Sequence, residues 1–148
     1  MKINARGNFI VRGQTSENGG PKKVSLFDGT YKSGFRVVRF EVAGEGPQFD
    51  DDATGKVTTD TVTTAADTWD WGDQREVAWS SSNHFSQSVR ESFNSIVDDA
   101  IVLVEEMYVY VHSTRGTGEL VNFLIELQPV DLKDWEYSLS YVQGKSQG

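Results

Sequence analysis

The chain has 148 residues, of which 24% are charged and 37% are hydrophobic, and its formal net charge at pH 7 is −8. This length fits one domain with a core of its own, and this composition excludes wholesale disorder. Because the chain has no cysteine, disulfides, thiolate metal ligands and thiol nucleophiles are excluded. The acidic balance and the scattered basic residues argue against direct nucleic-acid binding, which requires clustered Lys and Arg.

The sequence carries no recognisable membrane or export signal. No apolar run approaches the roughly 20 residues that a transmembrane helix needs. The N-terminal residues MKINAR lack the apolar region of a signal peptide. We therefore expect a protein that is made in the cytoplasm and has no membrane partner.

The N-terminal residues 1–23 are polar and glycine-rich, and they end at the breaker Gly19-Gly20-Pro21. One short apolar run interrupts this stretch, which suits an arm that docks on a neighbouring molecule. The alternative is a frayed terminus without a partner. We predict an N-terminal arm over 1–23, a single β-sandwich domain over 24–148, and partner-binding roles for Phe9, Ile10 and Val11.

Alternating apolar and polar residues predict a half-buried strand over 35–42, in which Val38, Phe40 and Val42 share one face. The acidic stretch 50–55 is predicted to be a loop. The following threonine-rich stretch, 56–64, favours an edge strand because it is β-branched but has few large apolar side chains.

A second short strand is predicted over 75–79. Beyond it, five serines within Ser80–Ser88 favour a loop over 80–95. The spacing of Phe85, Val89 and Phe93 would suit two helical turns, so a helix is the alternative for this stretch.

The last third of the chain has the strongest pattern. Met107, Val109 and Val111 alternate with polar or aromatic residues, and the run Val121–Leu127 alternates in the same way after a glycine-containing turn. This pattern predicts a β-hairpin. Asp131 is placed to cap a helix with an apolar stripe and a glycine stop, made of Leu132, Trp135, Leu139, Val142 and Gly144.

Taken together, these elements predict a mainly β fold. Strands at short, irregular spacing with a single late helix indicate an antiparallel β-sandwich, jelly-roll-like, with one short C-terminal helix. The sequence contains no internal repeat and no boundary between domains.

The consecutive aspartates raise the question of a calcium site. Asp50, Asp52, Thr54 and Gly55 match positions one, three, five and six of an EF-hand loop. Position twelve requires a bidentate glutamate and is Thr61 instead, so a solvated acidic loop is favoured. A weak ion site between subunits is the alternative.

Catalytic constellations are missing from the sequence. The only histidines are His84 and His112, and neither a G-x-S-x-G nor an H-E-x-x-H motif is present. Glu105 and Glu106 are adjacent in an expected strand and so point to opposite faces. A pairing of Glu41 with Glu126 across sheets stays open, since sequence alone carries no distances. We predict no catalytic residue, no metal ligand and no cofactor.

Two tryptophans form the most suggestive binding motif. Trp69 and Trp71 stand two residues apart beside Asp70 and Asp73, so in an extended segment both rings would point the same way. Such rings flanked by carboxylates are typical of sugar platforms, and they would equally suit a protein–protein hot spot. Burial in the core or between subunits is the structural alternative.

Three strings in the sequence resemble those of a protein family. They are SLFDGTYKSGFRV (25–37), TWDWGDQREVAW (68–79) and VDLKDWEYSLSYVQGKSQ (130–147). They resemble small proteins encoded by marine tailed phages and related viruses. The resemblance implies a virion structural protein without enzymatic activity, whose partners are copies of itself and other virion proteins, and whose location is the virion. Capsid decoration, major coat and tail positions all stay open.

The leading hypothesis is therefore a non-enzymatic virion component that works as a homo-oligomer or docks onto a shell or tail, with Trp69 and Trp71 as partner-binding anchors beside the N-terminal arm. The alternative is a carbohydrate-binding β-sandwich module, either free or as a receptor-binding part of a virus. A small hydrolase is a third class, for which the sequence points to no particular carboxylate.

Overall fold

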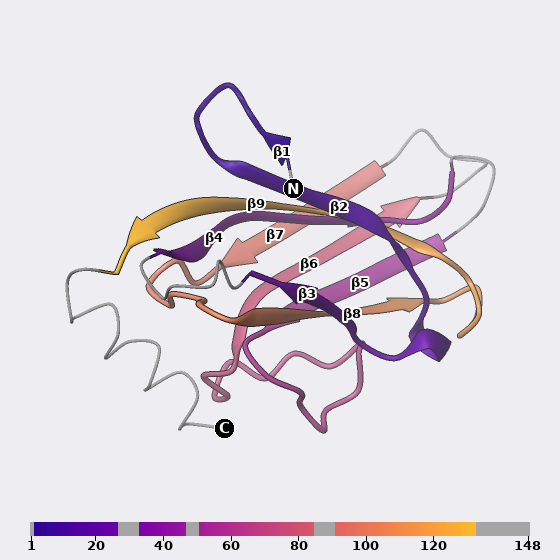
Figure 1. The fold of residues 1–148 in the computed structure, drawn as a ribbon. Helices are drawn as coiled ribbons and strands as arrows, with labels where there is room; N and C mark the ends of the chain where they lie inside the picture. Colours follow the sequence, from indigo (N-terminus) through magenta and orange to yellow (C-terminus); the bar gives the residue numbers. More distant parts are fainter. Residues whose placement is uncertain (1, 27–32, 47–50, 85–90, 133–148) are drawn as a thin grey trace.

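The computed structural model describes residues 2–26, 33–46, 51–84 and 91–132, and nearly all of its regular structure is β-strand (Figure 1). In chain order the elements are β1 (Lys2–Ile3), β2 (Phe9–Thr15), a 3-10 turn η1 (Glu17–Gly19), β3 (Lys22–Ser25), β4 (Ser33–Ala43), β5 (Asp51–Thr58), β6 (Glu76–His84), β7 (Glu91–Val97), β8 (Glu106–Ser113) and β9 (Val121–Asp131). Within these ranges no helix has the length and apolarity needed to cross a membrane.

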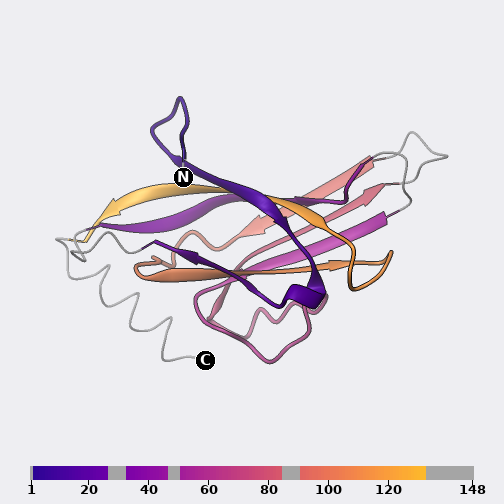
Figure 2. The ribbon, with the colours of Figure 1, turned by 45° about the vertical axis from the view of Figure 1, so that its right-hand side comes forward.

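The strands form two antiparallel sheets. The four-stranded sheet has the order β1-β2-β9-β4, and the five-stranded sheet has the order β3-β8-β5-β6-β7. The sheets lie face to face in a sandwich-like arrangement (Figures 1 and 2). The prediction of a mainly β, antiparallel fold is therefore confirmed.

The core lies between the sheets, where both contribute fully buried side chains. Phe40 and Ile125 come from the four-stranded sheet, and Val57, Met107 and Val109 from the five-stranded sheet; each is 0% exposed. Burying an aliphatic or aromatic side chain of this size stabilises the fold by about 1.5–3 kcal/mol. This shared core holds the two sheets together.

The predicted hairpin between β8 and β9 is wrong, although both strands exist. β8 pairs with β3 and β5, whereas β9 pairs with β2 and β4, so the two strands lie in different sheets. The connection passes through Gly116, whose φ of +146° suits glycine. Alternation predicts that each strand has one buried face, but it does not indicate which strands pair with each other.

The loop predicted over 50–55 is wrong for its described part, and the strand predicted over 56–64 is confirmed over 56–58 but is central, not at an edge. Asp51–Thr58 is the strand β5, which pairs with β8 on one side and β6 on the other. The sequence did not indicate that β5 is a central strand, because glycine and lysine are not typical core residues, although Gly55 and Lys56 are both buried.

The strand predicted over 35–42 is confirmed as part of β4, and Phe40 and Val42 share a face as predicted, but Val38 does not join them. The register with β9 skips Val38, which is the extra residue of a bulge. As a result Val37, Phe40 and Val42 all face the core, with 0–1% exposure.

The strand predicted over 75–79 is confirmed as the start of β6, whereas the loop predicted over 80–95 is wrong for its described part. Ser80–His84 continues β6, and Glu91–Val97 forms β7. Ser80 faces inward, where its hydroxyl oxygen accepts a hydrogen bond of 3.1 Å from the backbone N–H of Val42. Serines that satisfy backbone groups in this way are compatible with strands, so their number did not indicate a loop. Phe85 and Val89 lie outside the described residues.

The predicted C-terminal helix begins at the limit of the described chain. Asp131, the predicted cap, is the last residue of β9, and Leu132 packs with Val102 and Val104 in a small apolar cluster. The rest of the predicted stripe and its stop, Trp135, Leu139, Val142 and Gly144, lies outside the described residues.

The outer face of the four-stranded sheet is partly covered by the turn between β1 and β2 (Figure 1). Beneath this turn Glu126 is 3% exposed, and its carboxylate accepts hydrogen bonds from Asn8 (2.7 Å), Asn4 (3.1 Å) and Arg6 (2.7 Å). These donors, Asn8 first, hold the pKa of Glu126 below its ordinary value, against the opposing effect of burial.

Glu126 should make the stability of the fold depend on pH in the acidic range. Because its pKa is lowered on folding, its contribution is present above its ordinary pKa of 4.5 and is lost as pH falls through the folded value. At pH 7 the urea midpoint of unfolding should be higher for the wild type than for Glu126→Gln. This difference in midpoint should disappear as the pH is lowered. The control is Glu41→Gln, whose nearest basic contact, with Arg39, is 3.8 Å long; an equal gap in both variants would contradict the assignment.

Gly55 should not tolerate a side chain. A Cβ there would lie 2.7 Å from Val42 Cγ1 and 3.0 Å from both Phe40 Cζ and the Tyr110 carbonyl oxygen. Gly55→Ala should therefore lower the free energy of unfolding by about 1–3 kcal/mol, as overpacked cores do. Gly19→Ala is the matched control, since its nearest neighbouring atoms would be 3.8 Å away. Urea denaturation followed by circular dichroism measures both; equal stabilities would show that the sheets can separate at no cost.

Candidate functional site

The loop that joins β5 to β6, residues 59–75, folds against the outer face of the five-stranded sheet (Figure 2). We call it the β5–β6 loop. Beneath it lie Lys56 of β5 and Glu76 of β6, and the side chains of both are 0% exposed. The Lys56 ammonium is 3.2 Å from the Glu76 carboxylate. A buried ion pair of this kind is tolerated only where its remaining hydrogen-bonding groups are satisfied.

The β5–β6 loop satisfies the lysine. Lys56 Nζ donates to Thr64 Oγ1 at 2.6 Å and to the Thr68 carbonyl oxygen at 2.9 Å, in addition to Glu76. It also lies 5.5 Å from the ring centroid of Tyr110, within the range of a cation–π contact. An ammonium has three N–H donors, and each has an acceptor here.

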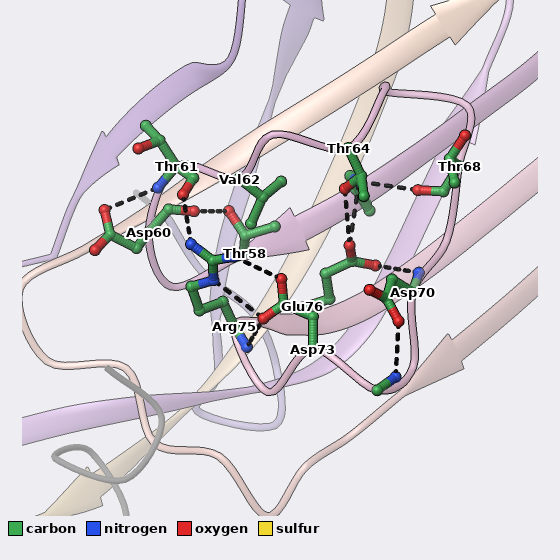
Figure 3. A network of polar contacts seen from close by, with 12 residues as sticks. Thr58, Asp60, Thr61, Val62, Thr64, Thr68, Asp70, Asp73, Arg75 and Glu76 are labelled. Atoms are coloured by element: carbon green, nitrogen blue, oxygen red, sulfur yellow. Dashed lines mark hydrogen bonds and ion pairs between the residues drawn. The ribbon is translucent and has the colours of Figure 1, made fainter. Parts of the chain in front are cut away.

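The loop and the sheet together satisfy the glutamate. Glu76 Oε1 accepts from the backbone N–H of Asp70 and from Trp79 Nε1, both at 2.9 Å, and Oε2 accepts from Thr64 Oγ1 at 3.3 Å. Figure 3 shows Glu76 reaching both Thr64 and the backbone of Asp70. One carboxylate therefore connects two positions within the loop, Thr64 and Asp70, with the tryptophan of β6.

A second ion pair closes the loop at its C-terminal end. Arg75 donates to both oxygens of Asp73, at 3.0 and 2.8 Å, in a bidentate arrangement (Figure 3). This hydrogen bonding holds the pKa of Asp73 below its ordinary value, although burial acts in the opposite direction. At the other end, Tyr110 Oη accepts from the backbone N–H of Val62 at 2.9 Å. The loop is thus held along its whole length.

The loop carries one tryptophan on its surface. The Trp71 side chain is 62% exposed, and its ring centroid is 5.8 Å from that of Trp79, which is 6% exposed. Across the β6–β7 ladder Trp79 is directly opposite Ile96, which is 44% exposed. Directly opposite residues share a face of the sheet. The exposed Trp71 and Ile96, together with the buried Trp79 that both adjoin, form an apolar site that we call the tryptophan patch.

The other predicted anchor, Trp69, is in a different environment. It is half-buried, and its Nε1 atom has no hydrogen-bond partner among the described residues. The segment is not extended, because Asp70 begins a turn: its carbonyl accepts from Asp73 N–H and its carboxylate from Gly72 N–H. Only Trp71 of the pair is open to a partner.

The apolar residues predicted to bind through an N-terminal arm lie in β2, which pairs with β9. Phe9 and Val11 are half-buried against the core, and the Phe9 ring meets Phe35 edge-on at 5.6 Å. Ile10, also half-buried, faces the opposite side of the sheet. A partner could reach Ile10 more easily than the other two.

The residues weighed for catalysis and metal binding do not converge. His112 pairs with Glu17 at 2.8 Å, and His84 is the last residue of β6. Of the EF-hand match, Asp50 lies outside the described residues, and Asp52, Thr54 and Gly55 stand in the strand β5 and not in a loop. In the parts of the chain that the structure describes, no group of three or more His, Asp or Glu side chains could hold a metal.

No protein-family model, curated protein or solved structure matches this chain. The candidate site is therefore defined by geometry alone. The sequence pointed to Trp71, but not to Lys56, Glu76, Trp79 or Ile96. A lysine between Gly55 and Val57 in a strand has the sequence signal of an exposed residue, and its partner is 20 residues away.

The Lys56–Glu76 pair should be strongly coupled. Lys56→Met or Glu76→Gln alone leaves one buried group without its partner and should cost about 3–5 kcal/mol of unfolding free energy. The double variant should cost clearly less than the sum of the two. Urea denaturation of the four proteins gives the coupling energy.

The matched control for this cycle is Lys23→Met with Glu106→Gln. That pair joins β3 to β8 in the same sheet at 2.9 Å, but its lysine side chain is 59% exposed. Exposed pairs contribute little. If the coupling energy of the control pair is as large as that of the buried pair, burial is not the cause of the strong coupling.

Proposed function

We propose that this chain is a non-enzymatic structural protein of a virion, a capsid, decoration or tail component that self-associates or docks onto other virion proteins. The observation that carries the proposal is the tryptophan patch, in which Trp71 stands 62% exposed on a platform held by a fully buried ion pair. A large aromatic ring held in place in this way is typical of an anchor for protein–protein contact.

The platform explains why such an anchor would be effective. A flexible side chain loses conformational freedom on binding, at a cost of about 0.5–1.5 kcal/mol. Trp71 lies against Trp79, whose indole N–H is bound to Glu76, so part of that cost is met during folding. Covering Trp71 and Ile96 by a partner would then remove apolar surface from water with little further ordering.

The order of the strands supports a jelly-roll fold as part of the proposal. In an eight-stranded jelly roll, strands pair first with eighth, second with seventh, third with sixth and fourth with fifth. Counting from β2, three of these pairs are present as ladders: β2–β9, β3–β8 and β5–β6. The fourth pair, β4 with β7, is represented by a hydrogen bond of 2.6 Å from Ser95 Oγ to the Phe40 carbonyl oxygen.

Jelly rolls are frequent in viral capsid proteins and in lectins, which is an argument by analogy of fold. It agrees with the resemblance of residues 25–37, 68–79 and 130–147 to small proteins of tailed phages. We accordingly propose the virion as the location, after synthesis in the host cytoplasm, and we propose no nucleic-acid, membrane or cofactor partner.

A carbohydrate-binding module is the second candidate. The exposed ring of Trp71 beside the exposed carboxylate of Asp70 favours it, because sugars stack on aromatic rings and bind carboxylates through their hydroxyls. This candidate predicts a soluble sugar ligand, whereas the structural role predicts a protein partner.

Removing Trp71 should weaken self-association strongly without unfolding the chain. Trp71→Ala should raise the dissociation constant at least about 30-fold, the effect of a hot spot of 2 kcal/mol. Sedimentation velocity over a range of concentrations measures it, with Leu120→Ala as control because Leu120 is an exposed apolar residue outside the patch, at 39% exposure. Unchanged assembly in Trp71→Ala, with binding of a soluble sugar lost, would replace the structural role by the sugar-binding one.

A further inference from the structure

The outer face of the four-stranded sheet is basic, although the chain as a whole is acidic. The register places Arg12 of β2, and Arg36 and Arg39 of β4, at outward positions of this sheet. Among the described residues, the charged ones on this face and its covering turn are Lys2, Arg6, Arg12, Arg36 and Arg39 against Glu41 and Glu126. This face therefore has a positive balance in a chain of net charge −8.

The opposite side of the sandwich is acidic. The β5–β6 loop contains Asp60, Asp67, Asp70 and Asp73 but only one basic residue, Arg75, which is bound to Asp73. Figure 2 shows this loop on the side of the five-stranded sheet that faces away from β2, β9 and β4. The molecule is thus polarised from one outer face to the other.

The basic face contains a hollow of about 580 Å³. Leu124 lies on the row that joins Arg12 to Glu41 across the outer face of the sheet. The complete lining is Arg12, Gly13, Gln14, Glu41, Val42, Ala43, Asn122, Phe123 and Leu124. A volume of this size is typical of pockets that hold small molecules, so one indole ring fits within it.

We propose that copies of this chain associate head to tail, with the tryptophan patch of one copy in the hollow of the next. Trp71 then covers Leu124, and the aspartates of the β5–β6 loop approach Arg12 and the other basic residues of that face. The inference rests on the self-association of the proposed function and specifies which two surfaces meet.

Charge decides between this arrangement and a symmetric one. Two copies that met through the same face would bring acid against acid, or base against base, and such contacts cost free energy. A head-to-tail contact joins opposite charges instead. Because it uses two different surfaces, a pair of copies keeps one patch and one hollow free, and the assembly grows into a ring or a filament.

The experiment uses one variant for each surface. Arg12→Glu reverses the charge at the rim of the hollow, and Trp71→Ala removes the anchor from the patch; both side chains are exposed, so folding should persist, which circular dichroism checks. Each variant alone should sediment as a monomer at concentrations where wild type assembles. Lys22→Glu is the control for Arg12→Glu, because it makes the same charge change at an exposed position in β3.

Mixing the two variants is the decisive step. Arg12→Glu keeps its tryptophan patch and Trp71→Ala keeps its hollow, so an equimolar mixture should form a dimer and grow no further. A mixture that stays monomeric, or an Arg12→Glu protein that assembles like wild type, would overturn the head-to-tail contact while leaving the proposed function standing. A wild-type chain that stays monomeric would overturn both the contact and the self-association on which it rests.

Discussion

The structure of the candidate site depends on a charge that is buried on the outside of a sheet. Lys56 is on the outward face of β5, yet it is 0% exposed because the β5–β6 loop covers it. Removing an ammonium and a carboxylate from water costs several kcal/mol for each ion, and this cost is offset only by close pairing and complete hydrogen bonding. Thr64, Thr68 and Asp70 supply those bonds from the loop. The conformation of the loop therefore follows from the needs of the ion pair.

Exposure of Trp71 is a consequence of the same constraint. Glu76 binds Trp79 Nε1, which orients that indole, and Trp71 rests on it at 5.8 Å between ring centroids. The chain thus contains an apolar surface whose rigidity comes from a polar network beneath it. This arrangement accounts for a large exposed ring in a loop that would otherwise gain stability by burying it.

Several of the strands can be predicted from the sequence, whereas their pairing cannot, and the reason is physical. Alternation reports that one face of a strand meets the core, so β4, β8 and β9 could be recognised from residues such as Phe40, Val109 and Ile125. Pairing depends on backbone edges, which every residue type shares, and so β8 and β9 could not be assigned to different sheets. The site shows the same limit: Trp71 was recognisable by its type, whereas Lys56 and Glu76 acquire their role only through contact with residues far along the chain.

The net charge likewise does not indicate how the charges are distributed between the two outer faces. A value of −8 suggests an acidic surface, but the pleat of β2 and β4 sends Arg12 and Arg39 to one side, while the aspartates gather in a loop on the other. Two faces of opposite charge on one molecule favour contact between unlike faces, and such contact leaves a free face at each end of every open assembly. The size of the assembly is then set by geometry, because only a rotation between neighbours that closes a ring can satisfy the last pair of faces.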